Sequence, residues 1–227
     1  MEKSILIGLI QNIAILLSFS MLYDYFWSRK DNYKSLSFKF ITGFVLGGIG
    51  IVLILTPWHF LPGIIFDTRS VVLSITGLFF GLIPTITAML ITALYRLTMG
   101  GAGAYMGIAV VFFSGAIGLL WRYLRPDWRR NKIRELALLG IIVHIVFFVC
   151  TILLPPELVS NTLKIISLPV ISIYPLATIL LGALMIHQEE NSNNRRALKR
   201  SEQKFKAIIE QASDAMYISD MNGNIID

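Results

Sequence analysis

The sequence is poor in cysteine and in charged residues. Its single cysteine, Cys150, lies within an apolar run, so the chain contains no internal disulfide. Charged residues make up 15% of the chain and apolar residues 55%, whereas soluble domains contain about 25% charged and about 45–50% apolar residues. Both departures exclude an ordinary soluble domain and indicate a protein that resides in lipid.

Chemical motifs are also lacking. No group of His, Cys, Asp or Glu has the spacing of a metal site, and no nucleophile–base signature is present. The sequence therefore predicts no metal and no cofactor, and any catalysis is expected in a further part of the parent protein. The net charge of +6 comes from short basic runs between apolar stretches, without interleaved stacking aromatics. Such runs are typical of membrane anchors, so no nucleic-acid partner is expected.

Apolar residues are concentrated in six long segments. A membrane-spanning helix needs about 20 apolar residues, and no segment alternates with the period of a strand, so we predict an all-α polytopic membrane protein. The first segment has no small-residue cleavage site at its end and is interpreted as a retained span. The six segments are 5–27, 40–56, 70–91, 104–121, 135–154 and 163–187.

The basic residues predict the orientation. They are grouped in loops 28–39 and 122–134 and in a polar linker after residue 187, whereas loop 155–162 has none. Because basic loops stay on the cytoplasmic side, we expect a multi-pass protein of the cell membrane with a cytoplasmic C-terminus.

This orientation creates a conflict in the number of crossings. If all six segments cross, loops 28–39 and 122–134 fall on opposite sides. They fall on one side if the third segment folds back, and Gly77, Gly81 and Pro84 interrupt it. We predict five crossings and a third segment broken near Pro84. Six crossings, with one loop against the charge rule, is the alternative.

Three ionisable residues, Asp67, Arg69 and Arg96, lie between apolar segments, where charges are costly and often functional. Two guanidinium groups on one site would select a small anion, and Asp67 would hold Arg69 in position. The backbone N–H groups of Gly100 and Gly101 could add to such a site. Alternatively, these residues form an interfacial ion pair, a snorkelling arginine and a tight turn.

The anion site and the broken segment depend on each other. Arg69 and Arg96 are 27 positions apart, which is about 40 Å along one straight helix. They can share a ligand only if the chain doubles back between them. Two further features are interpreted as structural: His144 as a hydrogen-bonded packing residue, and the glycines at 43, 47, 48 and 50 as a helix-packing face.

Two motifs flank the third segment, Asp67-Thr68-Arg69 and Tyr95-Arg96-Leu97-Thr98-Met99-Gly100-Gly101. With this spacing, the chain resembles the LytS/YhcK-type five-transmembrane sensor receptors (5TMR-LYT) over most of residues 1–190. The resemblance implies the input domain of a sensor histidine kinase or diguanylate cyclase, in which Arg69 and Arg96 contact a small carboxylate such as pyruvate. It also implies a homodimer and a downstream effector domain or response regulator. The chain has Asp67 where many members have Asn, which adds a negative charge beside the proposed anion site.

The C-terminal residues resemble the start of a PAS domain. Phe205, Ile208, Ile209 and Ala212 have the spacing of an amphipathic helix, and Asn222-Gly223 is a hairpin signal. We therefore expect a transmembrane sensor domain (1–187), a juxtamembrane linker helix (188–204) and a truncated, short α+β PAS-like part (205–227). A membrane receptor is the favoured function. A small-molecule transporter is the alternative, although it has no evident use for a PAS-like tail.

Overall fold

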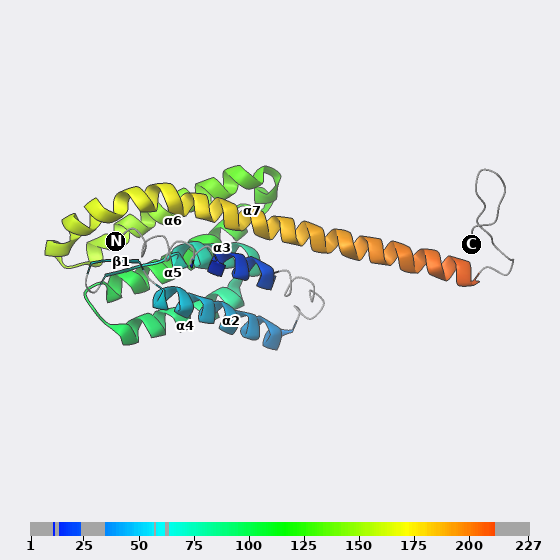
Figure 1. The fold of residues 1–227 in the computed structure, drawn as a ribbon, viewed down its shortest axis with the longest axis horizontal. Coiled ribbons are helices and arrows are strands. Elements are labelled where there is room, and N and C mark those ends of the chain that lie inside the picture. The colour runs from blue at the N-terminus through cyan, green and yellow to red at the C-terminus, as the bar shows by residue number, and fades with distance from the viewer. Residues whose placement is uncertain (1–10, 12–13, 24–34, 57, 62–63, 212–227) are drawn as a thin grey trace. The chain divides into compact units, whose positions relative to one another are not determined.

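The structure is a computed structural model that describes residues 11, 14–23, 35–56, 58–61 and 64–211 (Figure 1). The chain divides into two compact units, Met1–Gln188 and Glu189–Asp227. The described residues are helical apart from connections and one short β-hairpin. The elements are a helix Ala14–Tyr23, α2 (Leu36–Leu55), β1 (Trp58–Leu61), β2 (Ile64–Phe66), α3 (Arg69–Phe80), α4 (Leu82–Met99), α5 (Ala104–Leu124), η2 (Pro126–Asn131), α6 (Lys132–Cys150), η3 (Thr151–Leu153) and α7 (Pro156–Gln211).

Five of the described helices are long and apolar enough to cross a membrane: Leu36–Leu55, Leu82–Met99, Ala104–Leu124, Pro126–Leu153 and Val170–Ile209. Large apolar side chains are exposed on their outer faces, including Leu94, Phe113 and Leu180. In water these side chains would be unfavourable, whereas lipid solvates them. The predicted all-α polytopic membrane protein is confirmed. Of the predicted first segment, residue 11 and Ala14–Tyr23 are described, and both are helical.

The third apolar segment is broken, as predicted, and the break lies at Gly81. This residue has φ 81° and ψ −168°, a conformation that glycine adopts readily because it lacks a Cβ atom. Pro84, three residues later, lies in the first turn of α4, where the backbone N–H that proline lacks would have no helical partner. Glycine therefore makes the turn, and proline is accommodated just after it.

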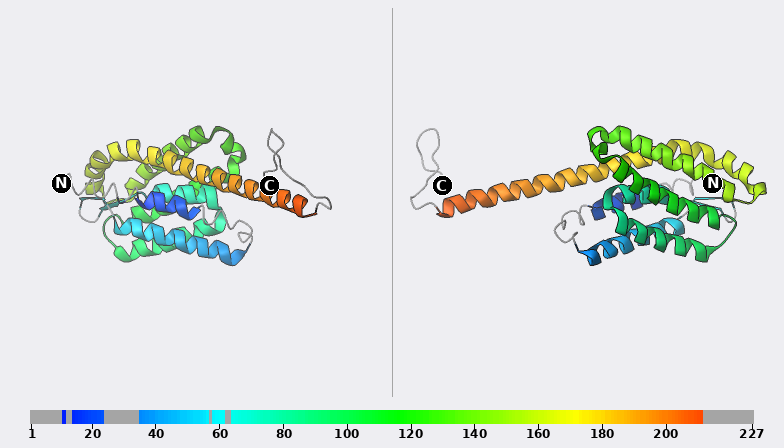
Figure 2. Two further views of the ribbon diagram at one scale, coloured as in Figure 1. Left: turned by 45° about the vertical axis from the view of Figure 1, so that its right-hand side comes forward. Right: turned by 180° about the vertical axis from the view of Figure 1, so that it is seen from behind.

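The small-residue face of α2 packs closely on α4. A Cβ atom at Gly43 or Gly47 would lie within 3.0 Å of Thr87 or Ile91 in α4. Gly43 faces Thr87, and Gly47, one turn further along α2, faces Ile91, one turn further along α4. The two helices α2 and α4 therefore run in the same direction, side by side in every view (Figures 1 and 2). The packing interpretation of this face is thereby confirmed, except that Gly48 faces open space.

Helix α3 lies at the centre of the bundle, and all of its residues are buried. It runs in the same direction as α5, because Gly77 packs against Gly115 and Leu119 and the end of α3 meets Arg122. The Arg122 Nη1 atom donates to the carbonyl oxygens of Leu78 and Phe79, both at 2.9 Å. Since α4 lies antiparallel to α5, α3 and α4 form a helical hairpin closed at Gly81.

The helical hairpin of α3 and α4 brings the basic segments to one end of the bundle. The start of α2 with Lys39, the turn at Gly81, and residues 122–134 all lie at one end of the bundle, the basic end. The opposite end carries β1–β2, Asp67 and the Gly100–Gly103 turn, and is termed the hairpin end after the β-hairpin β1–β2. Folding of the third segment thus places Lys39 and residues 122–134 together. Residues 28–34 of the first basic loop lie outside the described residues.

Two further differences concern the ends of predicted segments. The short antiparallel hairpin β1–β2, in which Trp58 pairs with Phe66, was not predicted. Residues 205–211 form the last part of α7. The remaining residues of the predicted PAS-like part, 212–227, lie outside the described residues.

Candidate functional site

A buried ion pair precedes and starts helix α3. The Asp67 Oδ1 atom accepts the backbone N–H of Arg69 at 2.9 Å and lies 3.1 Å from Arg69 Nε. The side chain of Asp67 is fully buried and that of Arg69 is 5% exposed. A carboxylate at this position also interacts favourably with the N-terminal end of the helix dipole. The pair is therefore part of the interior rather than of an exposed interface.

The second arginine, Arg96, lies in the last turn of α4 and is also buried, with 1% exposed. Its Nη1 atom donates to the carbonyl oxygen of Gly100 at 2.7 Å. Gly107 in α5 makes room for the side chain, because a Cβ atom there would lie 2.9 Å from Arg96 Nε. Arg96 is therefore not a snorkelling anchor, because the charged group of such an anchor reaches water.

The fold-back brings these three residues into one buried group, which we call the Asp67–Arg69–Arg96 cluster. Burial raises the pKa of the Asp67 carboxyl, and the positive charges of Arg69 and Arg96 oppose this rise. The charges of Arg69 and Asp67 also act on Arg96. With two positive charges and one negative, the cluster has one positive charge without a counter-charge.

Hydrogen bonding within the cluster is incomplete. Three of its buried polar atoms have no hydrogen-bond partner among the residues that the structure describes: Asp67 Oδ2, Arg69 Nη1 and Arg96 Nε. An unpaired buried polar group costs about 1–3 kcal/mol, and more when it is charged, so most such groups in proteins are paired. A ligand with both acceptor and donor groups would pair them.

The other predicted site residues surround Arg96 in the chain. Tyr95 is half-buried. Gly100 ends α4 with φ 61°, and its N–H donates to the carbonyl oxygen of Leu97 at 3.1 Å. Gly101 has φ 87°, and its carbonyl accepts the N–H of Ala104 at 3.1 Å. The glycines thus form the turn into α5, as in the structural alternative. Contact of Tyr95, Gly100 or Gly101 with a ligand stays a prediction.

Helices α6 and α7 add two polar residues, His144 and Tyr174, whose partners the sequence did not indicate. The His144 Nδ1 atom lies 2.6 Å from the carbonyl oxygen of Gly140, so it carries the proton. His144 Nε2 then accepts the hydroxyl of Ser70 at 3.2 Å. The interpretation of His144 as a hydrogen-bonded packing residue is confirmed. Its ring also contacts that of Tyr174, with centroids 5.2 Å apart.

Tyr174 connects these groups to the cluster, since the charges of Asp67 and Arg69 act on its hydroxyl. The signal in the sequence was only that Ser70, His144 and Tyr174 are polar residues within or beside apolar runs. Their partners lie on three different helices, so their association required the tertiary structure. Among the described residues, no three His, Cys, Asp or Glu side chains are grouped as metal ligands.

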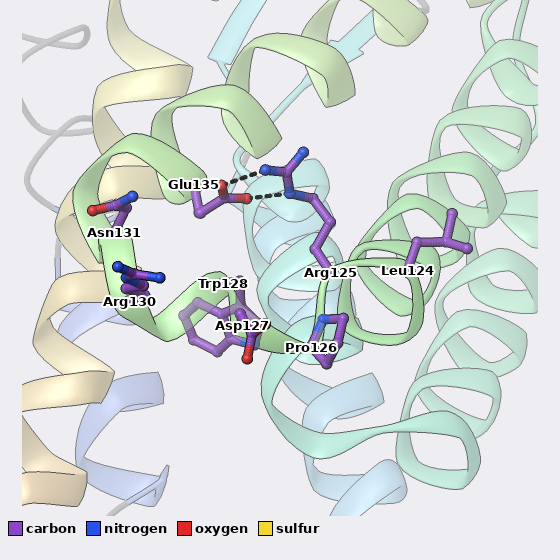
Figure 3. Close-up of a pocket in the computed structure, with 8 residues that line it drawn as sticks. All are labelled: Leu124, Arg125, Pro126, Asp127, Trp128, Arg130, Asn131 and Glu135. Carbon is purple, nitrogen blue, oxygen red and sulfur yellow. Dashed lines mark hydrogen bonds and ion pairs between the residues drawn. The ribbon is translucent and has the colours of Figure 1, made fainter.

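A cavity of about 350 Å³ lies at the basic end (Figure 3). There the guanidinium of Arg125 faces the carboxylate of Glu135, with Nε–Oε2 and Nη2–Oε1 distances of 2.7 Å. Trp121 Nε1 also donates to Glu135 Oε2 at 3.1 Å. The lining contains two arginines and two acidic residues, so it has no net charge and does not select an anion. The lining residues are Leu124, Arg125, Pro126, Asp127, Trp128, Arg130, Asn131 and Glu135.

Comparison with known proteins gives one match. Residues 5–188 match the family model described as 5TMR of 5TMR-LYT. No curated protein and no solved structure matches the chain. The matched range includes the whole Asp67–Arg69–Arg96 cluster and the helices that enclose it.

Proposed function

The chain belongs to the 5TMR of 5TMR-LYT family, and we propose that it is a receptor input domain that binds a small carboxylate between Arg69 and Arg96. The predicted five-transmembrane receptor family is confirmed over residues 5–188, and a membrane sensor receptor domain is the function that fits this family. The family favours the receptor over the transporter alternative. The ligand and its site are the proposal.

The observation that carries the proposal is the buried positive charge of the Asp67–Arg69–Arg96 cluster. A charge within an apolar bundle is unfavourable unless it is paired and hydrogen-bonded. Arg69 Nη1 and Arg96 Nε are donors that no described residue pairs, and guanidinium groups bind carboxylates through such donors. One carboxylate would supply the missing acceptors and the missing negative charge together.

The size of the charge distinguishes carboxylate from phosphate. The cluster lacks one counter-charge, because Asp67 already balances one of the two arginines. A monocarboxylate supplies a single negative charge, whereas a phosphate group carries about −1.5 to −2 at neutral pH. A phosphate would therefore leave an excess of buried negative charge. This favours a small monocarboxylate.

A route for the signal follows α3. Arg69 begins this helix at the hairpin end, and Arg122 binds the last carbonyl groups of the same helix at the basic end. A ligand with different affinity for two positions of α3 would shift the population between them. Such a shift would alter the contacts of α3 with Arg122 and α5 at the basic end.

The proposed output lies beyond this bundle. We infer that the basic end is cytoplasmic, because it carries Lys39 and the arginines of 122–134. The signal would pass through α7 and the PAS-like residues 205–227 to a histidine kinase or diguanylate cyclase domain, or a response regulator, in a homodimer. Fusion of residues 1–204 to a reporter enzyme at the C-terminus would test the orientation, since activity is expected only with a cytoplasmic reporter.

The binding proposal is tested by calorimetric titration of the full chain, purified in detergent, with pyruvate and related small carboxylates. Saturable binding is expected for the wild type and should be lost in Arg69→Ala and in Arg96→Ala. Arg130→Ala is the matched control, because Arg130 is exposed at the basic end and should leave binding unchanged. Far-UV circular dichroism of each variant checks folding. Loss in only one of the two cluster variants would contradict a shared ligand.

A further inference from the structure

The ion pair between Asp67 and Arg69 joins Asp67 Oδ1 to Arg69 Nε. Asp67 Oδ1 accepts the backbone N–H of Arg69 at 2.9 Å and forms an ion pair with Arg69 Nε at 3.1 Å. The other carboxylate oxygen, Oδ2, and the terminal nitrogen Nη1 of Arg69 are buried and have no hydrogen-bond partner in the described part of the chain. Carboxylate–guanidinium pairs commonly form two parallel hydrogen bonds. Here the second hydrogen bond is missing, so the acceptor Oδ2 and the donor Nη1 remain available to a ligand.

A simple anion does not pair both atoms. A carboxylate ligand accepts hydrogen bonds, so it pairs with Arg69 Nη1 and Arg96 Nε but has nothing to donate to Asp67 Oδ2. An ionised carboxylate oxygen is an acceptor only. The ligand therefore needs a donor close to its own carboxylate group. Thr92 Oγ1 is also unpartnered, but it lies against Gly50 in α2 and is not part of this arrangement.

We propose that the ligand is a small hydroxy acid, whose carboxylate binds Arg69 and Arg96 and whose adjacent hydroxyl donates to Asp67 Oδ2. This rests on the proposed function, because the same two arginines hold the carboxylate. The donor could be a hydroxyl or an ammonium group, and the net charge of the ligand decides between them. A hydroxy acid carries the single negative charge that the cluster lacks, whereas a zwitterionic amino acid has no net charge and places an ammonium group beside two arginines.

The specificity is tested with four three-carbon acids that differ at one position: lactate, pyruvate, propionate and alanine. Dissociation constants are measured by calorimetry on the full chain in lipid nanodiscs. One hydrogen bond to a charged group corresponds to a roughly tenfold or greater change in Kd. We therefore expect lactate to bind at least about tenfold more tightly than pyruvate or propionate, and alanine to bind more weakly than lactate.

Asp67→Asn is the matched variant, because it keeps the shape of the side chain. The amide oxygen must take the place of Oδ1 to accept the backbone N–H of Arg69 and to face its Nε, which puts the amide NH₂ group in the place of Oδ2. A donor then replaces an acceptor, and the keto oxygen of pyruvate can accept from it. The ratio of pyruvate Kd to lactate Kd is expected to fall by about tenfold or more.

Each outcome separates this inference from the proposed function. Equal binding of lactate and pyruvate by the wild type, with loss of both in Arg69→Ala, would overturn the hydroxy-acid inference and support the carboxylate site. Tightest binding of alanine, or a ratio unchanged in Asp67→Asn, would also overturn the inference. Absence of binding of all four acids to the folded wild type would contradict the proposed function, and this inference with it.

Discussion

Substitution of Gly77 by alanine tests the packing that holds α3 in the centre of the bundle. A Cβ atom at this position would lie 2.7 Å from the carbonyl oxygen of Gly115 and 2.7 Å from the backbone nitrogen of Leu119, whereas ordinary contacts are 3.4–4 Å. Both obstacles are backbone atoms of α5, so no side chain can rotate away. The two helices must separate by several tenths of an ångström.

The size of the effect follows from this overlap. Overpacking of a well-packed interior costs about 1–3 kcal/mol. Alanine at Gly48 in α2 is the control, because a Cβ atom there meets nothing within 4 Å. Gly48→Ala also replaces a helical glycine by alanine, and this replacement by itself stabilises a helix by about 0.5–1 kcal/mol. This gain is common to both variants and cancels, so they should differ by the overpacking cost alone, about 1–3 kcal/mol.

The assay is thermal unfolding of both variants in the same detergent, followed by far-UV circular dichroism at one heating rate. Gly77→Ala is expected to unfold at a lower temperature than the wild type, and Gly48→Ala at the same temperature or a higher one. If Gly77→Ala unfolded at or above the temperature of Gly48→Ala, the close parallel packing of α3 on α5 would be wrong.

Three further substitutions probe the two ends of α3 and the junction of α5 with α6. Arg122→Ala removes the donors to two α3 carbonyl groups, so carboxylate binding should persist while ligand-induced hydrogen-exchange changes at residues 125–134 disappear; persistence of those changes would exclude Arg122 from the relay. His144→Phe leaves the Ser70 hydroxyl without its partner, and chemical unfolding should show a loss of about 1–3 kcal/mol; an unchanged midpoint would contradict this hydrogen bond. Glu135→Gln weakens contacts with Arg125, which is 50% exposed, so stability should fall by no more than about 1 kcal/mol. A loss several times larger in the same unfolding assay would mean that solvent does not screen this pair.

The break in the third segment was predictable because glycine and proline act through local backbone geometry. The position of the break was less predictable, since Gly77, Gly81 and Pro84 were all candidates within eight residues. The structure uses Gly81 with positive φ for the turn, buries Gly77 against α5, and places Pro84 in a first turn. The choice among them depended on which glycine met a neighbouring helix, and that is a tertiary property.

The association of Arg69 with Arg96 could be deduced from charge and chain reversal together. Two buried arginines repel each other and come together only with a counter-charge such as Asp67 or an anionic ligand, and doubling back of the chain was the arrangement that placed Lys39 and residues 122–134 at one end. The contacts of His144 with Ser70 and with Tyr174 could not be deduced. They join α3, α6 and α7, and no periodicity within one helix predicts a partner on another.

The central claim is that one carboxylate contacts both Arg69 and Arg96. It is tested most directly by solid-state NMR of the full chain in lipid, with ¹³C-carboxyl-labelled lactate and ¹⁵N-labelled arginine, measuring distances from the ligand carboxyl carbon to guanidinium nitrogens. We expect short distances to two guanidinium groups, one removed by Arg69→Lys and the other by Arg96→Lys. Contact with one of them only, or with arginines of residues 122–134 instead, would contradict it.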